Sequence, residues 1–311
     1  MTKRALVTGA SGQDGHYLTR HLAKLGREVL GVGLDAPRDA VCKNVVVDIA
    51  NHEAMGMLVK DFAPDEVYHL AAYHRSSAAK VDISPSEEDE LYFLYNVEAT
   101  RHLLACAAAL NNQCRVFLAG SSHLFGNTKD FPQTEETPIQ PNSIYGITKA
   151  MNLWLGRYYR EHRNLFCVTG ILYNHESPLR GPTFVTGRIA RAAAQISRGE
   201  ISELVMGNLD AQVDWGFAGD YVRAMVLMLE ADIPQDRIIA SGQLHRVRDF
   251  VQLAFDRVGL DYTRYVTENT GVHRPVATSV YWGDIKSIEA IGFRPTVTFE
   301  ELVVMMVEAH R

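Results

Sequence analysis

The 311-residue sequence lacks several features that would assign it to a special class of protein. It has only four cysteines, and no two of them form a Cys-x-x-Cys pair. This argues against a disulfide framework and a metal site, and it fits a reducing compartment. No apolar run reaches the roughly 18 residues that a membrane-spanning helix needs. The chain passes from Met1–Arg4 directly into a short apolar run, so we expect no signal peptide and a cytoplasmic enzyme.

An excess of positive charge is also missing. Lysine plus arginine total 31 and aspartate plus glutamate total 37, which gives a formal net charge of −6. Proteins that bind a phosphate backbone carry basic patches, so we expect no nucleic-acid partner, and a local basic site must hold any anionic ligand. The hydrophobic fraction of 47% and the charged fraction of 22% are ordinary for a globular protein.

The sequence does contain a repeated alternation of short apolar runs and helical patterns. The apolar runs lie at residues 5–8, 28–32, 45–47, 67–72, 115–119 and 167–172. The helical patterns lie between them, at residues 17–25, 51–62, 84–104 and 142–162. Continuously apolar runs are typical of parallel strands that helices cover on both faces. We therefore predict an α/β fold with a Rossmann-type, doubly wound parallel sheet.

The alternation becomes less regular after about residue 175. Helical patterns there alternate with short strands, and they lie at residues 185–197, 220–229, 248–258 and 299–308. We predict a dinucleotide-binding Rossmann domain over residues 1–175. A smaller α/β substrate-binding lobe is predicted over residues 176–311, partly interleaved with the first. No linker separates the two, so we expect them to pack together.

A glycine-rich turn, Thr8–Gly15, lies between the first apolar run and the first helical pattern. Glycines permit a tight turn and close approach to a pyrophosphate, and the helix N-terminus then faces its negative charge. No Gly-Lys-Ser/Thr follows, which excludes a P-loop. A plain strand-to-helix turn is the alternative, but the strand-turn-helix context favours a bound NAD or NADP. The predicted contacts in the turn are Gly9, Ser11, Gly12, Gln13, Asp14 and Gly15.

The end of the second strand distinguishes NAD from NADP. An acidic residue there bonds the ribose hydroxyls, whereas an arginine accepts the 2′-phosphate. Asp35 favours NAD, although Arg38 lies close enough to leave NADP open. After the third strand, Asp48 and Ile49 are placed to border the adenine. Asp48 can also cap the following helix, and the two roles are compatible.

A Tyr-x-x-x-Lys pair, Tyr145 and Lys149, lies near the start of the helical pattern at 142–162. Residues four apart share one helical face. An ammonium group beside a phenol favours the phenolate and lowers the tyrosine pKa toward the range of a general base. The fifth strand ends in Gly120–His123, which can bring the Ser121 hydroxyl to the same point. Ser121, Tyr145 and Lys149 are therefore the predicted catalytic groups.

With these residues, the sequence resembles the extended short-chain dehydrogenase/reductase family, and within it the GDP-mannose 4,6-dehydratase branch. The resemblance covers nearly the whole chain. The most specific stretches, Asn174–Pro178 and Gly207–Ala211, point to a GDP-linked sugar. The other stretches that carry it are Gly12–Gly15, Leu70–Ala72, Tyr145 with Lys149, Tyr173, Thr183–Thr186, Asp214–Gly216, Arg274–Pro275 and Gly292–Pro295.

The resemblance implies an NAD(P)-dependent enzyme that modifies nucleotide sugars. Tyr145 would take the proton of the sugar 4-hydroxyl while hydride passes from C4 to the nicotinamide. Lys149 would hold the nicotinamide ribose, and Ser121 would hydrogen-bond the 4-oxygen. Asn174, Arg188 and Arg274 would hold the diphosphate, which two arginines can neutralise bidentately. The implied substrate set is Asn174, Thr183, Val185, Arg188, Asn208 and Arg274, and the implied cofactor contacts include Leu70, Ala71 and Ala72.

For two of these residues a structural role is the alternative. Arg188 could be a surface residue of its helix, and Asn174 could form the turn at a strand end. Around the fourth strand, the unusual stretch Tyr73–Ser77 brings His74 and Arg75 to where they can face the substrate.

The chain departs from the family pattern at the residue that separates dehydration from simple redox chemistry. The dehydratases carry a glutamate after the fifth strand, which removes the C5 proton and helps to expel the C6 hydroxyl. This chain has His123 there. Imidazole can act as a base near neutral pH, so elimination is the first hypothesis. A redox-only C4 reductase, dehydrogenase or epimerase is the second, and a protein without catalysis, which intact Ser121, Tyr145 and Lys149 argue against, is the third.

Two other departures concern the cofactor and assembly. Val213 stands where the family usually has an arginine, and the basic residues after the second strand are replaced by Leu34 and Asp35. The following segment, which carries NADP contacts and part of the tetramer interface in the family, is short. The family often pairs subunits through the two helices that flank the fifth strand. By analogy we expect a homodimer or a higher homo-oligomer.

Overall fold

The computed structural model describes residues 2–35, 41–75, 83–110, 113–269 and 280–311. Its largest layer is a seven-stranded sheet with strand order β10-β6-β5-β4-β1-β2-β3, in which every pair is parallel. The strands are β1 (Arg4–Thr8), β2 (Glu28–Gly33), β3 (Lys43–Val46), β4 (Glu66–His69), β5 (Arg115–Ala119), β6 (Phe166–Leu172) and β10 (Arg237–Ile239). The strand order reverses between β1 and β4, which confirms the predicted doubly wound sheet and marks the edge where such folds bind ligands.

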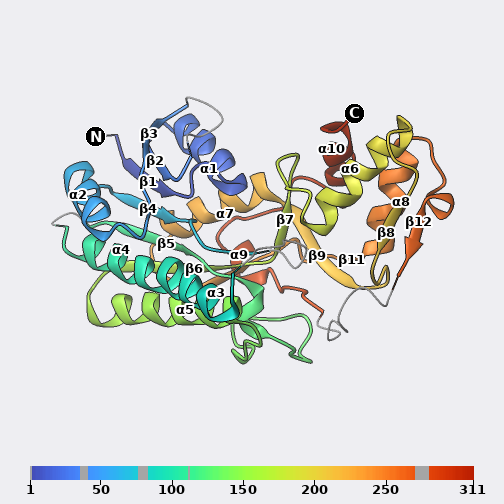
Figure 1. Ribbon diagram of the computed structural model, residues 1–311. Coiled ribbons are helices and arrows are strands. Elements are labelled where there is room, and N and C mark those ends of the chain that lie inside the picture. The colour runs from blue at the N-terminus through green and yellow to red at the C-terminus, as the bar shows by residue number, and fades with distance from the viewer. Residues whose placement is uncertain (1, 36–40, 76–82, 111–112, 270–279) are drawn as a thin grey trace.

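Helices cover both faces of this sheet (Figure 1). On β1, Ala5 and Val7 join one apolar cluster and Leu6 joins another on the opposite face, because successive strand side chains alternate. The first cluster lies under α1 (Gln13–Lys24) and α7 (Ala218–Glu230). The second lies under α2 (His52–Phe62) and α4 (Ala99–Ala108), and α5 (Ile144–His162) packs beside α4. Burial on both faces explains the continuously apolar strands.

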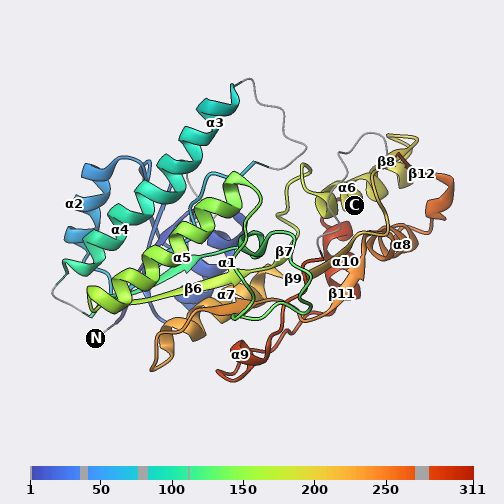
Figure 2. The ribbon, with the colours of Figure 1, turned by 90° about the horizontal axis from the view of Figure 1, so that it is seen from below.

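One predicted helix is divided. The pattern at 84–104 becomes α3 (Pro85–Tyr92), a π-helical turn η1 (Phe93–Glu98) and α4 (Ala99–Ala108). The predicted start is confirmed, since Ser84 and Glu87 form a capping box. Figure 2 shows the three segments as one continuous rod. The π turn widens the rod where Asn96 is buried, and π turns often mark functional sites.

The second half of the chain forms a smaller lobe and also adds elements to the large sheet. A three-stranded sheet, β11-β9-β7, and a two-stranded sheet, β12-β8, lie with helices around a cluster that contains Trp215 and Phe250. These elements are β7 (Asn174–Glu176), α6 (Val185–Ser197), β8 (Leu204–Met206), β9 (Gln212–Phe217), β11 (Leu244–Arg246), α8 (Val247–Arg257), η3 (Tyr262–Arg264), β12 (Val266–Glu268) and α10 (Phe299–Glu308). The chain also returns to the large sheet, because α7, β10 and α9 (Lys286–Glu289) pack there. Within the described ranges, no helix is both long and apolar enough to cross a bilayer.

Candidate active site

The glycine-rich turn connects β1 to α1 at the reversal of the strand order. Gly9 has φ +72°, and a Cβ there would lie 2.9 Å from the backbone nitrogen of Ala71. A Cβ on Gly15 would lie 2.3 Å from the Gly9 carbonyl oxygen. Gly12 is the N-cap of α1, so the amides of the first helical turn face the space above the turn. This backbone cradle, which a side chain would fill, fits a dinucleotide diphosphate.

The end of β4 forms the other wall of this cradle. The strand ends at His69, although the predicted apolar run continues to residue 72. Leu70, Ala71 and Ala72 follow without pairing to a neighbouring strand. The Ala71 amide donates to the Thr8 hydroxyl at 3.2 Å, which locks the wall to β1. The predicted contacts Leu70–Ala72 therefore lie directly beside the turn.

The side chains of Gln13 and Asp14 are engaged away from the cradle. Asp14 Oδ2 lies 2.8 Å from His175 Nε2, and the Ser177 hydroxyl donates to Gln13 Oε1 at 2.8 Å. The Gln13 amide also donates to the His175 carbonyl at 3.0 Å. Any contact of these two residues with a diphosphate is left to their backbone amides, and their cofactor role stays a prediction.

The predicted adenosine contacts lie after β2 and β3. Asp35 is exposed just beyond β2, and Arg38 lies outside the described residues. Asp48 accepts hydrogen bonds from the Ala50 amide at 2.9 Å and the Tyr95 hydroxyl at 3.1 Å. Asn51 caps α2, so the alternative role of Asp48 as the helix cap is wrong.

Two caps position the catalytic side chains. Ser143 caps α5 by accepting from the Gly146 amide at 3.1 Å, which places Tyr145 and Lys149 on the first two turns. Ser121 caps the 3₁₀ turn η2 (Ser122–Phe125) directly after β5 and accepts from the His123 amide at 3.3 Å. The ends of β5 and α5 thus bring the predicted Ser121, Tyr145, Lys149 and His123 together.

The balance of charges at Tyr145 differs from the sequence-based expectation. Burial raises the pKa of Tyr145 to about 12, and the groups that oppose it are Ser121 and Arg180 rather than Lys149. The Lys149 ammonium lies 5.6 Å from the Tyr145 ring centre and donates to the Ala119 carbonyl at 2.8 Å. Burial lowers the pKa of Lys149 to about 8. The phenol therefore needs further positive charge nearby to act as a base.

Two imidazoles flank Tyr145. The ring centre of His74 lies 4.3 Å from that of Tyr145, and the ring centre of His123 lies 5.7 Å from it on edge. His123 also stacks on Tyr281 at 5.2 Å. Desolvation lowers the pKa of both histidines. The charge of His123 lowers the pKa of His74 further, to about 4. Both rings are therefore neutral near pH 7, so each can accept a proton.

The π turn supplies a residue that sequence reasoning missed. Buried Asn96 accepts from the Tyr73 amide at 2.7 Å and donates to the Tyr73 carbonyl and the Thr148 hydroxyl, both at 3.1 Å. It thus holds the segment after β4, which carries His74, against the helix that carries Tyr145. Helical periodicity gave no signal for it, because an apolar pattern does not distinguish a π turn from an α turn.

The predicted substrate contacts are spread around β7 and α6. Arg188 on α6 is half-buried, its Nε has no hydrogen-bond partner among the described residues, and its Nη2 lies 3.4 Å from Met206 Sδ. Asn174 lies in β7, and Thr183 is exposed before α6. Val185 packs on the apolar cluster of the second half.

Two further residues, Asn208 and Arg274, were predicted to contact the substrate. The Asn208 side chain accepts from the Asp210 amide at 2.8 Å in an exposed turn, so its substrate role stays a prediction. Arg274 lies outside the described residues. The sequence analysis missed Arg180, which pairs with Glu176 at 2.9 Å and stacks its guanidinium 3.8 Å from the Phe184 ring centre.

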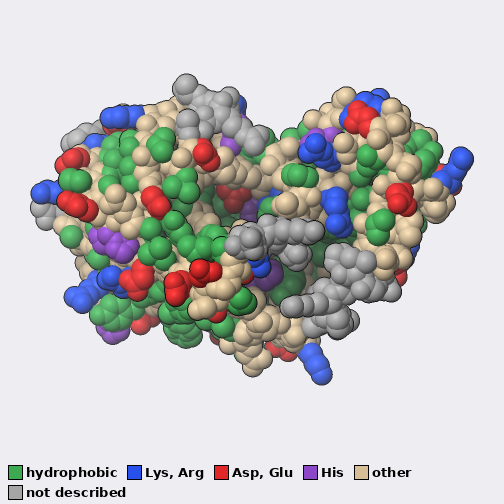
Figure 3. Space-filling model, in the orientation of Figure 1, with side chains coloured by type: hydrophobic (Ala, Val, Ile, Leu, Met, Phe, Trp, Pro, Cys, Tyr) green, Lys and Arg blue, Asp and Glu red, His purple; other side chains and the backbone are tan. Residues whose placement is uncertain are grey.

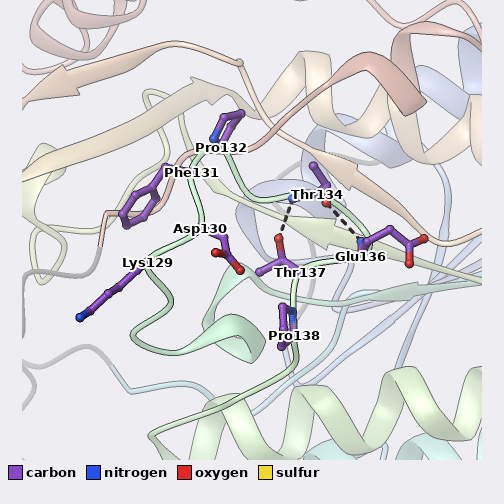
Figure 4. Close-up of a pocket in the computed structure, with 8 residues that line it drawn as sticks. All are labelled: Lys129, Asp130, Phe131, Pro132, Thr134, Glu136, Thr137 and Pro138. Carbon is purple, nitrogen blue, oxygen red and sulfur yellow. Dashed lines mark hydrogen bonds between the residues drawn. The ribbon is translucent and has the colours of Figure 1, made fainter.

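A surface hollow of about 450 Å³ lies under the loop 129–138 (Figure 4). Its lining contains none of the predicted site residues, and Thr134 and Thr137 stabilise its wall through local hydrogen bonds. Within this loop, buried Gln133 accepts from the Tyr173 hydroxyl at 2.7 Å and the Trp282 amide at 2.9 Å. The loop therefore supports Tyr281, the stacking partner of His123, but is not the active site.

Comparison with known proteins identifies the family. The family model described as GDP-mannose 4,6 dehydratase matches residues 6–306. The chain is 37% identical to GDP-mannose 4,6 dehydratase 2 of Arabidopsis thaliana over 98% of this chain and 86% of that relative. The human GDP-mannose 4,6 dehydratase is 34% identical over 98% of this chain and 90% of its own length. The chain belongs to the GDP-mannose 4,6-dehydratase family.

Solved structures share the fold of this family member. A UDP-glucose 4-epimerase of Thermotoga maritima with UDP-glucose gives a TM-score of 0.85 at 22% identity and covers 98% of both chains. A UDP-glucose 4-epimerase of Thermus thermophilus in complex with NAD gives 0.83 at 22% identity, over 99% of this chain and 98% of that one. RMD of Pseudomonas aeruginosa with NADPH also gives 0.83, at 21% identity, with the same coverage.

Membership of the GDP-mannose 4,6-dehydratase family sharpens the departure at His123. The family resemblance leads one to expect a carboxylate at this position, whereas the structure has a neutral imidazole beside Tyr145.

Proposed function

We propose that the protein oxidises C4 of a GDP-linked hexose with bound NAD or NADP and then eliminates water across C5 and C6. GDP-mannose is the proposed substrate. The observation that carries the proposal is the meeting of Ser121, Tyr145, Lys149 and His123 at the carboxyl end of β5. Ser121, Tyr145 and Lys149 serve the oxidation, and a neutral base beside them serves the elimination.

Tyr145 removes the proton of the sugar 4-hydroxyl in the first step. A dinucleotide held at the glycine-rich turn would supply the hydride acceptor, and the positive charge of its oxidised ring would oppose the burial that raises the pKa of Tyr145 to about 12. Ser121 holds the 4-oxygen. Lys149 is held by the Ala119 carbonyl at 2.8 Å, from where its ammonium can bond the ribose.

His123 performs the second step. The 4-ketone acidifies the C5 proton, and the neutral His123 imidazole takes it. The resulting imidazolium then donates a proton to the C6 hydroxyl, which leaves as water. The reduced dinucleotide would supply the hydride for C6, and C5 would take a proton from solvent, so the product would be a 4-keto-6-deoxy sugar and the dinucleotide would not be consumed.

The diphosphate lies against cationic side chains. The Nε of Arg188 has no hydrogen-bond partner in the described ranges, and a buried guanidinium nitrogen of this kind favours a bidentate anion. Arg180 adds positive charge close enough to lower the pKa of Tyr145. Asp35 at the end of β2 favours NAD over NADP.

A redox-only reaction on a GDP-sugar, as a C4 reductase, dehydrogenase or epimerase, is the second candidate. The observation that favours it is the stacking of His123 on Tyr281, which gives this ring a packing role. In the redox-only reaction, Ser121, Tyr145 and Lys149 serve the oxidation at C4 as described, and the C5 proton is not removed.

Proton NMR of GDP-mannose with the purified protein and added NAD or NADP separates the two candidates. A new C6 methyl doublet supports dehydration. Cofactor reduction or exchange at C4 without a methyl signal supports the redox-only reaction. If GDP-mannose is unchanged, a GDP-heptose and a GDP-4-keto sugar are tried next, and turnover of neither would refute both candidates.

We further propose that a second copy of the chain covers the outer face of α5. Ile147, Met151, Trp154 and Tyr158 form an exposed apolar stripe at helical spacing, and Trp154 is 56% exposed. Figure 3 shows hydrophobic side chains gathered over α4 and α5. A twofold pairing of this face gives a homodimer. The four cysteines are free thiols, which supports the cytoplasm as its location.

A further inference from the structure

Three contacts join the glycine-rich turn to the segment Asn174–Ser177. Asp14 Oδ2 lies 2.8 Å from His175 Nε2. Gln13 donates to the His175 carbonyl at 3.0 Å and accepts from the Ser177 hydroxyl at 2.8 Å. The partners are 161 to 164 residues apart in the sequence, so the contacts join two distant parts of the chain. Figures 1 and 2 show β7 beside the start of α1.

The Asp14–His175 pair is largely shielded from water. The two side chains are 20% and 12% exposed. Burial alone would lower the pKa of His175, but the charge and hydrogen bond of Asp14 outweigh it and raise that pKa. The same contact outweighs burial at Asp14 and lowers the pKa of its carboxyl. The other groups that face His175 are Arg180 and the Tyr221 ring, whose centre lies 4.6 Å away.

Residues of α6 and α7 also bond to the segment Asn174–Ser177. Glu176 accepts from the Thr186 hydroxyl at 2.6 Å, and Thr186 lies in the first turn of α6, two residues before Arg188. The Tyr221 hydroxyl donates to the Asn174 carbonyl at 3.4 Å. These contacts connect the glycine-rich turn to the residues proposed to hold the sugar nucleotide.

We propose that Gln13 and Asp14 are positioning residues that couple dinucleotide binding at the turn to sugar-nucleotide binding at Asn174 and Arg188. This inference rests on the proposed function. A dinucleotide that fixes the turn also fixes the segment Asn174–Ser177 through the three contacts. Each ligand then strengthens the binding of the other by the same factor, as thermodynamic linkage requires.

Isothermal titration calorimetry with GDP as the probe measures this factor. The dissociation constant of GDP is determined with and without saturating dinucleotide for the wild type and for Asp14→Ala, His175→Ala and the double variant. We expect the dinucleotide to strengthen GDP binding about fivefold or more in the wild type. Each single variant should lose most of this factor, and the double variant should lose no more. Glu308→Ala, which removes the distant surface ion pairs with Arg257 and Arg311, is the matched control.

The readout separates coupling from damage to the turn. The backbone amides remain in Asp14→Ala, so the affinity for the dinucleotide alone should fall less than the coupling factor. In the wild type, the factor should persist below the raised pKa of His175 and decline as the pH rises through it, because the imidazolium then loses its charge. If Asp14→Ala does not fold, Ser177→Ala removes the hydrogen bond to Gln13 and the local one from the Leu179 amide, leaves the Asp14–His175 pair in place and should lower the factor partly.

An unchanged factor in folded Asp14→Ala and Ser177→Ala would overturn the inference. So would wild-type protein that binds GDP equally well with and without dinucleotide, although the proposed function would stand. Wild-type protein that binds the dinucleotide but neither GDP nor GDP-mannose would refute the proposed function and this inference together.

Discussion

The two sides of the active site are built by different means. At the dinucleotide side the backbone forms the site, and a Cβ on Gly9 or Gly15 would collide with neighbouring backbone atoms. At the proposed sugar side the candidate groups are side chains, among them His123, His74 and Arg188. A backbone cradle tolerates little change, whereas side chains can be exchanged without altering the fold.

The largest expected effect comes from Tyr145→Phe, which removes the hydroxyl shared by both candidate reactions. General acid–base groups contribute roughly 10²–10⁴ in rate, so turnover should fall by about that factor. Initial rates with GDP-mannose measure it. Because the phenyl ring keeps its packing against His74, binding of GDP should change little. Near-normal turnover would remove Tyr145 from the mechanism.

The second prediction concerns the side-chain region. His123→Ala should lower formation of the C6 methyl product roughly 10²-fold while reduction of the bound dinucleotide continues. His74→Ala, which removes the other neutral imidazole, should retain the methyl product. A reversed outcome would assign the C5 proton to His74.

The pH dependence of elimination follows from the same residue. Burial lowers the pKa of His123, so the neutral base should persist below the ordinary imidazole value of about 6.5. Elimination should therefore continue as the pH falls through 6.5 and decline only at lower pH. A decline centred above 6.5 would contradict this assignment.

The third prediction tests the backbone region. A Cβ on Gly15 would lie 2.3 Å from the Gly9 carbonyl oxygen, so Gly15→Ala should displace the turn and weaken dinucleotide binding about tenfold. Fluorescence titration measures the affinity. Gly56→Ala in α2 is the control, because a Cβ there meets the His102 ring at 3.6 Å and Cys106 Sγ at 3.8 Å, both ordinary contact distances. Equal affinities of the two variants would show that the cradle tolerates a side chain.

The fourth prediction concerns assembly. Trp154→Glu places a charge in the apolar stripe of α5 and should convert a dimer to monomers in light scattering. Ile233→Glu, at a position 73% exposed outside the stripe, should leave the dimer intact. A wild-type monomer would refute the proposed interface.

The smallest effect is expected at Asp35. Asp35→Ala should weaken NAD binding several-fold and leave NADP binding nearly unchanged. An acidic residue there bonds the ribose 2′-hydroxyl of NAD, which carries a phosphate group in NADP. Equal losses for both dinucleotides would count against the preference for NAD.

Local patterns predicted much of the fold. The apolar runs, the glycine-rich turn and the helix start near residue 84 depend on residues close in sequence, and the structure confirms them. The division of the helix at 84–104 was not predictable, because the buried Asn96 that occupies the π turn is defined by contacts with Tyr73 and Thr148. Neither partner can be inferred from the helix's own periodicity.

The side-chain partners in the site were predictable only in part. Spacing and the cap at Ser143 explain why Tyr145 and Lys149 share a face. The partners of Asp14 and Gln13 lie more than 160 residues away, so the local motif could not reveal these side-chain contacts. The position of His123 was predicted, but its stacking on Tyr281 depends on a distant segment.

The most direct test of the account is the reaction of GDP-mannose in D₂O, followed by NMR. If His123 removes the C5 proton, the product should carry a new C6 methyl group and deuterium at C5, because the carbon is reprotonated from solvent. Cofactor reduction with a fully protonated C5 and no methyl signal would contradict elimination and leave the redox-only reaction.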